Sequence, residues 1–387
     1  MKRILIFTAG FGEGHNTAAR NIRDALGEAG RGRCEVEVVD LVARCHPRAN
    51  QVLRRLYNLA IHRAPRLWGT FYRLVDELAT SRQRVEGLGD MRGALEAVLR
   101  ERPADVLVSV YPAYGYVFAQ LDPGWKRRLK RVTVITDSIT INSVWYRSEC
   151  DEYVVPNEPT AEVLRARGVD PGLIRVLGFP VQGVFAKEGA FPPRPDPAVE
   201  PRLLYVVNAG RRRAHEVVRR LMEIRDLRLT VCAGNSARVE ERIRRVAGGG
   251  RAEVMGWTRE MPRLLMTHHA VISKAGGATT QEAIAAGCPM IVSQVVPGQE
   301  EGNFDLLRSV GGGVKASTPA EIHDAVRDMF DDGAAKWRQM REGLRSIAHP
   351  DAALRIAEHL LGIGGEIEGG DGGARGGGEG TVAAPNA

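Results

Sequence analysis

The sequence predicts an α/β protein built from two doubly wound domains. Short β-branched runs alternate with amphipathic stretches along most of the chain, which is typical of βα units on a parallel sheet. The chain has 387 residues, enough for two such domains, each with its own core. Residues 186–201 contain five prolines, too many for the interior of a helix or strand. We therefore expect a first domain over 1–185, a stiff linker over 186–201 and a second domain over 202–334, facing each other across a cleft.

The first domain is expected to hold six strands, at 3–7, 35–39, 105–110, 131–136, 152–155 and 174–177. A helix follows the first strand, because apolar residues recur at helical spacing from Ala18 to Ala29, and Gly30 ends it. The second domain repeats the theme with strands at 202–207, 228–232, 253–255, 270–272 and 290–292.

The C-terminal part of the chain should contain helices and then lose regular structure. Thr318, Pro319 and Glu321 have the spacing of a capped helix start. The stretch 335–361 is expected to be a helical region broken at His349-Pro350. Eleven of the last 26 residues are glycine, so we expect the tail 362–387 to be disordered.

Composition excludes several classes of protein. Hydrophobic residues make up 44% and charged residues 26% of the chain, as in globular proteins, and no run of 18 apolar residues suggests a membrane span. The five cysteines form no C-x-x-C pair, which argues against a zinc site or a disulfide framework and favours a reducing compartment. We expect no metal and no cofactor.

A basic segment lies in the first domain. Between Arg44 and Arg73 there are seven arginines and no Asp, Glu or Lys, a surplus equal to the net charge of +7 on the whole chain. Aromatic and aliphatic residues interleave with these arginines, which favours docking on an anionic lipid surface. The alternative is a pair of core helices with an arginine-rich exposed face. No nucleic-acid-binding motif accompanies the charge, so we expect no nucleic acid partner. The residues expected to dock are Arg54, Arg55, Arg63, Arg66, Trp68 and Phe71.

The first glycine-rich loop, residues 8–16, joins the first strand to the first helix. Gly12, Gly14 and Asn16 there suit contact with a phosphate or with the acceptor, because glycines expose backbone amides. The spacing G-x-G-x-G differs from the dinucleotide fingerprint G-x-G-x-x-G. His15 stands beside the helix N-terminus, and it either takes part in chemistry or simply packs at the turn.

The second glycine-rich loop, residues 273–283, follows the strand at 270–272. Gly276, Gly277, Thr279 and Thr280 offer amides and hydroxyls at a helix start, which suits a diphosphate. Glu282 is expected three residues into that helix, where its carboxylate would accept hydrogen bonds from ribose hydroxyls. The alternative is an ordinary Gly–Thr turn with Glu282 in a capping box.

Two further turns of the second domain add polar groups. Gln299, Glu300 and Asn303 cluster between glycines after the strand at 290–292 and are suited to sugar hydroxyls. Gly256 and Trp257 follow the strand at 253–255, where their backbone could pair with a base edge.

Taken together, these loops, the turn at Asp137 and the sequence Gly178-Phe179-Pro180-Val181 resemble the monogalactosyldiacylglycerol synthase and processive diacylglycerol glucosyltransferase family. That family is related to the peptidoglycan transferase that forms lipid II. The resemblance runs from about residue 2 to 361, and its most specific part is the run Pro-Gly-Gln-Glu-x-Gly-Asn.

The resemblance implies a GT-B fold, with an N-terminal acceptor domain, a C-terminal donor domain and a final helix, within 335–361, that crosses back. It implies a UDP-sugar donor, a lipid acceptor, no metal and inversion at the anomeric carbon. By the same analogy Glu282 holds the ribose, Gly256 and Trp257 the uracil, the segment 276–280 the diphosphate, and Gln299 with Glu300 the hexose.

An inverting transfer needs a base for the proton of the acceptor hydroxyl and positive potential for the leaving diphosphate. Asp137, at the end of an apolar strand, and His15 are the two candidates for the base, and the residues do not decide between them. The most favoured acceptor is diacylglycerol, and the expected location is the cytoplasmic face of the membrane as a peripheral protein. The alternatives are a transferase acting on a polyprenyl-linked acceptor, an isomerase like UDP-N-acetylglucosamine 2-epimerase, or a nucleotide-sugar-binding module without activity.

Overall fold

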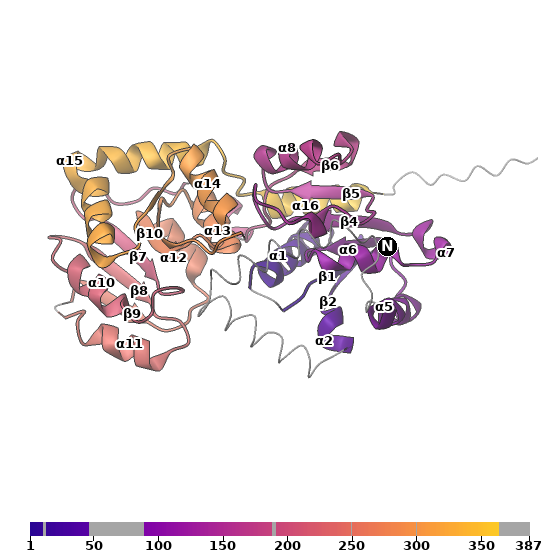
Figure 1. Ribbon diagram of the computed structural model, residues 1–387, viewed down its shortest axis with the longest axis horizontal. Helices are drawn as coiled ribbons and strands as arrows, with labels where there is room; N and C mark the ends of the chain where they lie inside the picture. Colours follow the sequence, from indigo (N-terminus) through magenta and orange to yellow (C-terminus); the bar gives the residue numbers. More distant parts are fainter. Residues whose placement is uncertain (11–12, 46–88, 188–190, 249, 299, 364–387) are drawn as a thin grey trace, which may run out of the picture.

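The chain folds into two lobes, each built on a six-stranded sheet in which every strand pairing is parallel (Figure 1). This is a computed structural model, and it describes residues 1–363 except 11–12, 46–88, 188–190, 249 and 299. The six residues expected to dock, Arg54, Arg55, Arg63, Arg66, Trp68 and Phe71, and the tail from residue 364 onward therefore lie outside the described residues. None of the helices in the described part of the chain is long and apolar enough to span a bilayer.

The sheet of the first lobe has the strand order β2-β1-β3-β4-β5-β6. Its order reverses direction beside β1, and in doubly wound sheets a ligand binds beyond the carboxyl ends of the strands near such a point. All six predicted strands are confirmed, with ends that differ by a few residues. They are β1 (Lys2–Phe7), β2 (Cys34–Val39), β3 (Val106–Ser109), β4 (Lys130–Val134), β5 (Glu152–Val155) and β6 (Ile174–Val176).

Helices connect these strands, and several begin at side-chain caps. Asn157 caps α8 by accepting a hydrogen bond from the Thr160 amide at 3.0 Å. Gly30 follows the last residue of α1, as predicted, and its amide donates to the Leu26 carbonyl at 2.8 Å. The helices are α1 (Glu13–Ala29), α2 (Leu41–Cys45), α5 (Gly89–Glu101), α6 (Ala113–Ala119), α7 (Pro123–Lys126), α8 (Glu158–Ala166) and α9 (Val184–Lys187), with short 3-10 turns η1 (Ser143–Trp145) and η2 (Pro171–Leu173).

The sheet of the second lobe has the order β12-β11-β10-β7-β8-β9. The five predicted strands are confirmed, and a sixth, β12, was missed. The strands are β7 (Arg202–Val206), β8 (Arg228–Cys232), β9 (Ala252–Met255), β10 (Ala270–Lys274), β11 (Met290–Gln294) and β12 (Gly313–Lys315). Their connecting helices are α10 (Ala214–Leu221), α11 (Ala237–Arg244), α12 (Met261–Thr267), α13 (Gly277–Ala286) and α14 (Glu301–Ser309).

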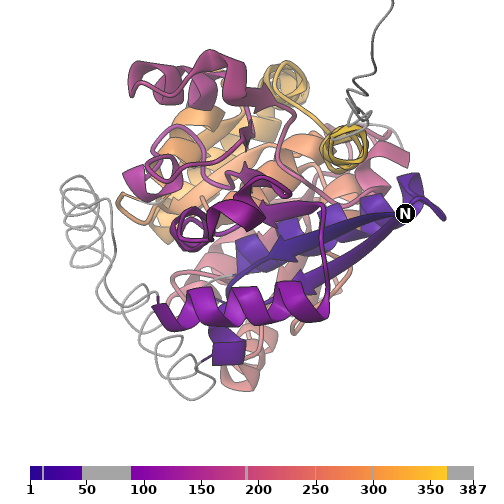
Figure 2. The same cartoon turned by 90° about the vertical axis from the view of Figure 1, so that its right-hand side faces the viewer.

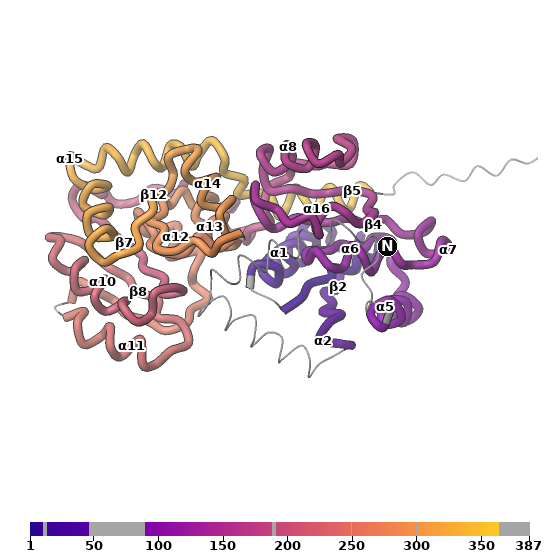
Figure 3. Tube along the Cα trace, viewed as in Figure 1, coloured from indigo at the N-terminus to yellow at the C-terminus, as the bar shows by residue number. Residues whose placement is uncertain are grey.

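The chain ends with two helices, of which the second crosses back to the first lobe. Thr318 and Glu321 form the predicted capping box of α15 (Pro319–Arg345), which is kinked by non-helical backbone at residues 331–334. After the break at His349-Pro350, α16 (Ala352–Gly362) packs against α1 and ends where the Lys2 ammonium donates to the Leu361 carbonyl at 2.8 Å. Figure 3 shows its yellow trace inside the first lobe.

The two lobes share part of their apolar core. One cluster of buried side chains runs from Ile4 and Ile22 of the first lobe to Ile284 and Leu306 of the second. A separate cluster lies beneath α10, α11 and α15, on the other face of the second sheet.

The linker 186–201 is anchored to the second lobe rather than free. Arg194 lies within it, and its guanidinium donates to the carbonyls of Leu265, Ala286 and Gly287 at 2.9, 2.8 and 3.0 Å. Arg341 and Arg345 of α15 stack on the Phe191 ring at 5.4 and 4.9 Å. These contacts fix the exit of the linker against α12, α13 and α15.

Candidate active site

Asp137 lies just beyond the carboxyl end of β4 and is half-buried. Its Oδ2 accepts a hydrogen bond from the indole Nε1 of Trp145 at 2.8 Å. Burial raises the pKa of Asp137 to about 6, and the bond from Trp145 works in the opposite direction. The carboxylate therefore titrates close to the pH at which a general base is most effective.

His15 lies in the first turn of α1, facing the same turn. Its Nδ1 is 3.0 Å from the Thr136 hydroxyl oxygen, and its ring packs edge-on to Tyr111 at 5.2 Å. Burial lowers the pKa of His15 to about 4, so the imidazole is neutral at pH 7.

Both candidate bases therefore belong to one cluster, joined by Trp145 and Thr136. The Trp145 ring lies 6.0 Å from the His15 ring while its N–H binds Asp137, and Thr136 precedes Asp137 in the chain. Sequence reasoning missed Trp145, because this residue lies in an isolated 3-10 turn with no periodic pattern around it.

Hydrogen bonds hold the rest of the first glycine-rich loop in place. The Thr8 hydroxyl donates to Asn16 Oδ1 at 3.0 Å, and the Gly10 amide donates to Asp40 Oδ2 at 3.2 Å. A side chain at Gly14 would meet open space, whereas Gly12 lies outside the described residues. Asn16 thus shapes the loop through Thr8.

The second glycine-rich loop opens α13, but the helix begins earlier than predicted. Its first residue is Gly277, so Glu282 is in the second turn and not three residues in, and Thr279 is inside the first turn. The N-cap residue, Gly276, has no side chain with which to cap the helix. The first backbone amides of α13 are therefore free to bind a ligand at the helix N-terminus. Thr280 is fully buried, and its Oγ1 has no hydrogen-bond partner within the described chain.

Glu282 lies where α13 of the second lobe meets the first lobe, a region that we call the seam, and it does not form a capping box. It is 7% exposed, and the charge that acts on it comes from Arg20 on α1 of the first lobe. Burial raises the pKa of Glu282 to about 7, and Arg20 only partly offsets this. A buried carboxylate with a single distant cation is suited to hydrogen-bond donors from a ligand.

In the loop that carries Gln299, Glu300 and Asn303, most of the described polar side-chain atoms have partners within the protein. Glu300 is 4% exposed, forms an ion pair with the Lys274 ammonium and accepts from the Val296 amide at 3.0 Å. Asn303 donates to the Ala275 carbonyl at 3.0 Å, while its Oδ1 has no partner within the described residues. Gln299 lies outside the described residues.

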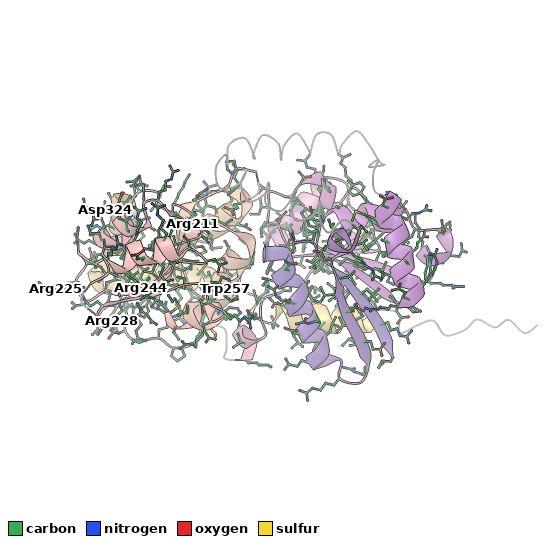
Figure 4. All side chains as sticks on the ribbon, turned by 90° about the horizontal axis from the view of Figure 1, so that it is seen from below. Arg211, Arg225, Arg228, Arg244, Trp257 and Asp324 are labelled. Carbon is green, nitrogen blue, oxygen red and sulfur yellow. The ribbon has the colours of Figure 1, made fainter. Side chains whose placement is uncertain are left out.

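Gly256 and Trp257 leave the carboxyl end of the edge strand β9. A side chain at Gly256 would come within 3.2 Å of Glu240 and 3.5 Å of the Gly234 carbonyl, so the backbone runs close to the neighbouring turn. The Trp257 side chain is 62% exposed, with the Arg259 guanidinium 5.8 Å from its ring. Figure 4 shows Trp257 on the side of the second lobe that faces the first.

The turns of the two lobes meet at the seam. A Cβ at Gly277 would lie 3.4 Å from the Thr136 carbonyl oxygen. Gln281 donates to the Ser138 hydroxyl at 3.1 Å, and the Gly302 amide donates to the Thr140 hydroxyl at 2.8 Å. The glycine start of α13 therefore abuts the turn that carries Asp137, a contact between lobes that sequence periodicity does not reveal.

No group of three or more His, Cys, Asp or Glu side chains in the described part of the chain is placed to hold a metal ion. Positive potential at the seam comes from the start of α13 and from Arg20, since the charge of Lys274 is neutralised by Glu300.

Comparison with known proteins gives the context of this site. A sequence model of the family described as monogalactosyldiacylglycerol (MGDG) synthase matches residues 15–181. The processive diacylglycerol beta-glucosyltransferase of Bacillus cytotoxicus is 26% identical over 371 residues, which cover 93% of this chain and 93% of that protein.

Solved structures match the fold of both lobes. The crystal structure of MurG from Acinetobacter baumannii superposes with a TM-score of 0.61 at 12% identity, covering 93% of this chain and 99% of that one. The UDP-GlcNAc 2-epimerase of Neisseria meningitidis, bound to UDP-GlcNAc, gives 0.59 at 12% identity and covers 93% and 100%. These likenesses confirm the GT-B fold. The chain is therefore similar to the monogalactosyldiacylglycerol synthases over residues 15–181, and to the processive diacylglycerol glucosyltransferases over most of its length.

Proposed function

We propose that this chain transfers a hexose from a UDP-sugar to diacylglycerol, with inversion at the anomeric carbon. The observation that carries the proposal is the close approach of the two lobes at the seam, where a Cβ added to Gly277 of the helix start would lie 3.4 Å from the carbonyl oxygen of Thr136 in the Asp137 turn. A diphosphate on the first turn of α13 would place its sugar beside the two candidate bases. The name of the Bacillus relative supplies the acceptor class, diacylglycerol.

The transfer is a single displacement. The acceptor hydroxyl oxygen forms a bond to the anomeric carbon as the bond from that carbon to the diphosphate oxygen breaks, and UDP leaves. The hydroxyl proton goes to a base on the protein. The α13 N-terminus stabilises the charge that develops on the diphosphate, since its amides and dipole point to that place.

Asp137 is the base in this proposal. Its pKa of about 6 leaves it ionised at neutral pH but basic enough to take a proton, whereas His15, with a pKa of about 4, is a much weaker acceptor. Trp145 occupies Oδ2 of Asp137 and fixes the plane of the carboxylate, which leaves Oδ1 for the acceptor hydroxyl. His15 then positions the turn through Thr136.

The donor domain holds the nucleotide in separate parts. Glu282 accepts from the ribose hydroxyls, and Gly276, Gly277, Thr279 and Thr280 bind the diphosphate. Backbone groups of Gly256 and Trp257 pair with uracil, while Gln299, Glu300 and Asn303 contact the hexose. The unpartnered oxygens of Thr280 and Asn303 support this assignment, because a buried polar atom without a partner costs roughly 1–3 kcal/mol until a ligand satisfies it.

The protein is proposed to work as a peripheral protein on the cytoplasmic face of the membrane, docked through Arg54, Arg55, Arg63, Arg66, Trp68 and Phe71. Gly12, Gly14 and Asn16 would then meet the acceptor that reaches the seam from that surface. All five cysteines are free, which supports a reducing compartment.

The test is incubation of the full chain with a panel of UDP-hexoses and either diacylglycerol or a polyprenyl phosphate in mixed micelles, with mass analysis of products. We expect a hexosyl-diacylglycerol and stoichiometric UDP. Transfer only to the polyprenyl lipid would replace the acceptor, and an epimerised UDP-sugar without UDP release would overturn the transferase.

A further inference from the structure

The strongest charge asymmetry of the described chain lies in the donor domain. Residues 202–263 contain 15 arginines, no lysine and 7 acidic residues, a surplus of 15 − 7 = 8, larger than the +7 of the whole chain. Thirteen of these arginines are exposed. The excess is therefore displayed on the surface.

Most of the acidic residues in this region are already used by a subset of the arginines. Glu216, Glu223, Glu240, Glu241 and Glu260 pair with arginines three or four positions away on the same helix or turn. Within the described residues, the following exposed arginines have no acidic partner: Arg211, Arg212, Arg219, Arg225 and Arg238. Their charge is available to a partner.

These arginines come from α10, α11 and the turns around them, which we call the α10–α11 face. Figure 4, viewed from below, shows Arg211, Arg225, Arg228 and Arg244 spread along the second lobe. In Figures 1 and 2, α11 lies on the same side of the molecule as α2, which contains Arg44, the first arginine of the basic segment. The α10–α11 face and the end of α2 therefore lie on one side of the molecule.

The cavity beside this face has few free groups for a small anion. A cavity of about 620 Å³ beside β8 and β9 is lined by Arg228, Arg244 and Arg251. Arg244 donates to the Val254 carbonyl at 2.5 Å and Arg251 to the Ile224 carbonyl at 2.8 Å, so these guanidinium groups are already engaged. The available charge is spread over an extended surface, which matches a bilayer better than one small ligand.

We propose that the α10–α11 face is a second docking surface of this protein, and that its partner is the anionic headgroup layer of a lipid bilayer. Guanidinium groups bind lipid phosphates well, because their planar donors match phosphate oxygens. Trp257 is the one large aromatic side chain exposed in the described chain, so the face lacks the row of stacking rings that single-stranded nucleic acid uses. Contact at both lobes would hold the donor domain at the membrane along with the acceptor domain.

The experiment is vesicle co-sedimentation of the full chain without any nucleotide sugar, so that binding is measured apart from transfer. The vesicles contain phosphatidylcholine alone or phosphatidylcholine with about 30 mol% phosphatidylglycerol, an anionic lipid that gives the surface a negative potential. The variant is the triple substitution Arg219→Gln, Arg225→Gln and Arg238→Gln. We expect its partition coefficient on anionic vesicles to fall about 100-fold, since each basic residue near such a surface contributes roughly fivefold.

The matched control removes the same charge elsewhere, by Arg308→Gln, Arg327→Gln and Arg338→Gln on α14 and α15, at the opposite side of the lobe in Figure 1. Thermal unfolding checks that both triple variants fold. An equal loss in the control, or wild-type binding by the α10–α11 triple, would overturn the proposal. So would a triple variant that keeps its vesicle binding but loses binding to a single-stranded RNA oligonucleotide, which would assign the face to nucleic acid. Transfer to a short-chain, micellar diacylglycerol should be unchanged in the α10–α11 triple, because none of its residues lies at the seam.

Discussion

The two walls of the seam hold their ionisable groups in opposite ways. On the acceptor side, Asp137 and His15 are desolvated, and burial moves the pKa of Asp137 up to about 6 and that of His15 down to about 4. On the donor side, Lys274 and Glu300 neutralise each other in an ion pair, and Glu300 also takes a backbone amide.

This difference separates chemistry from binding. A group that is to accept a proton needs a pKa near neutrality, which desolvation provides for a carboxylate but not for a histidine. A group that holds a substrate needs a fixed charge and geometry, which a paired network provides. Glu282 breaks the pattern. It belongs to the donor domain but is desolvated like Asp137, with a pKa raised to about 7.

The largest effect is expected at Asp137. Asp137→Asn keeps the bond from Trp145 but removes the base, so turnover should fall about 10³-fold, within the range for general-base catalysis. Affinity for UDP, measured by calorimetry, should be unchanged because the donor domain is intact. Asp122→Asn, an exposed carboxylate of the same lobe, serves as the control. Near-normal turnover of Asp137→Asn would move the base to His15.

At Glu282 we expect opposite effects on binding and on stability. Glu282→Gln should weaken UDP binding by about 10–100-fold, the cost of one or two charge-assisted hydrogen bonds. The folded-state pKa is raised, so ionisation of Glu282 penalises folding as pH rises from the unfolded value of 4.5 to about 7, and the penalty is complete above that. The substitution should therefore raise the free energy of unfolding at pH 8 by at most about 3 kcal/mol.

Denaturant unfolding at pH 8 and pH 4.5 tests this sign, because almost no gain is expected at the lower pH, where the folded state binds the proton and the unfolded state is about half protonated. Glu358→Gln on the exposed side of α16 is the matched control and should change neither quantity. A loss of stability at pH 8 would mean that the Glu282 carboxylate is satisfied inside the protein and is not kept for a ligand.

Gly302 tests whether the closed seam matters. A methyl group there would overlap the Ser138 carbonyl of the other lobe, so Gly302→Ala must separate the turns. We expect a loss of about 1–3 kcal/mol in unfolding free energy if the lobes stay together, as for an overpacked core. If they open instead, turnover falls and the radius of gyration by X-ray scattering increases. Gly27→Ala on α1, where a side chain meets open space, is the control.

The strands of both sheets could be predicted from local sequence patterns, because buried parallel strands are short apolar runs that are easy to recognise. β12 was not predicted, because it has only three residues and begins at the end of the run Gly311-Gly312-Gly313, without a run of β-branched residues. The start of α13 was placed too late because two of its first three residues, Gly277 and Thr279, have weak helix propensity.

The site was only half predictable for a different reason. Asp137, His15 and Glu282 stand at strand ends or in helix starts, and strand ends converge in a doubly wound sheet. Trp145, Thr136 and Arg20 modify those groups from other parts of the chain, and only packing brings them there. Sequence spacing carries no information about such tertiary partners.

The smallest expected effect is in the pH dependence of transfer, which distinguishes Asp137 from His15 as the base. At saturating UDP-sugar, which removes any contribution of Glu282 to donor binding, kcat/KM for the acceptor should rise with pH and level off above about 7. Because Asp137 titrates with a pKa of about 6, the value at pH 5 should be about tenfold below the plateau. A base with the pKa of His15, about 4, would instead give a flat profile from pH 5 to pH 8. If Asp137→Asn retained the limb near pH 6, that limb would belong to another group, and desolvation of Asp137 would serve the fold of its turn and not the transfer of a proton.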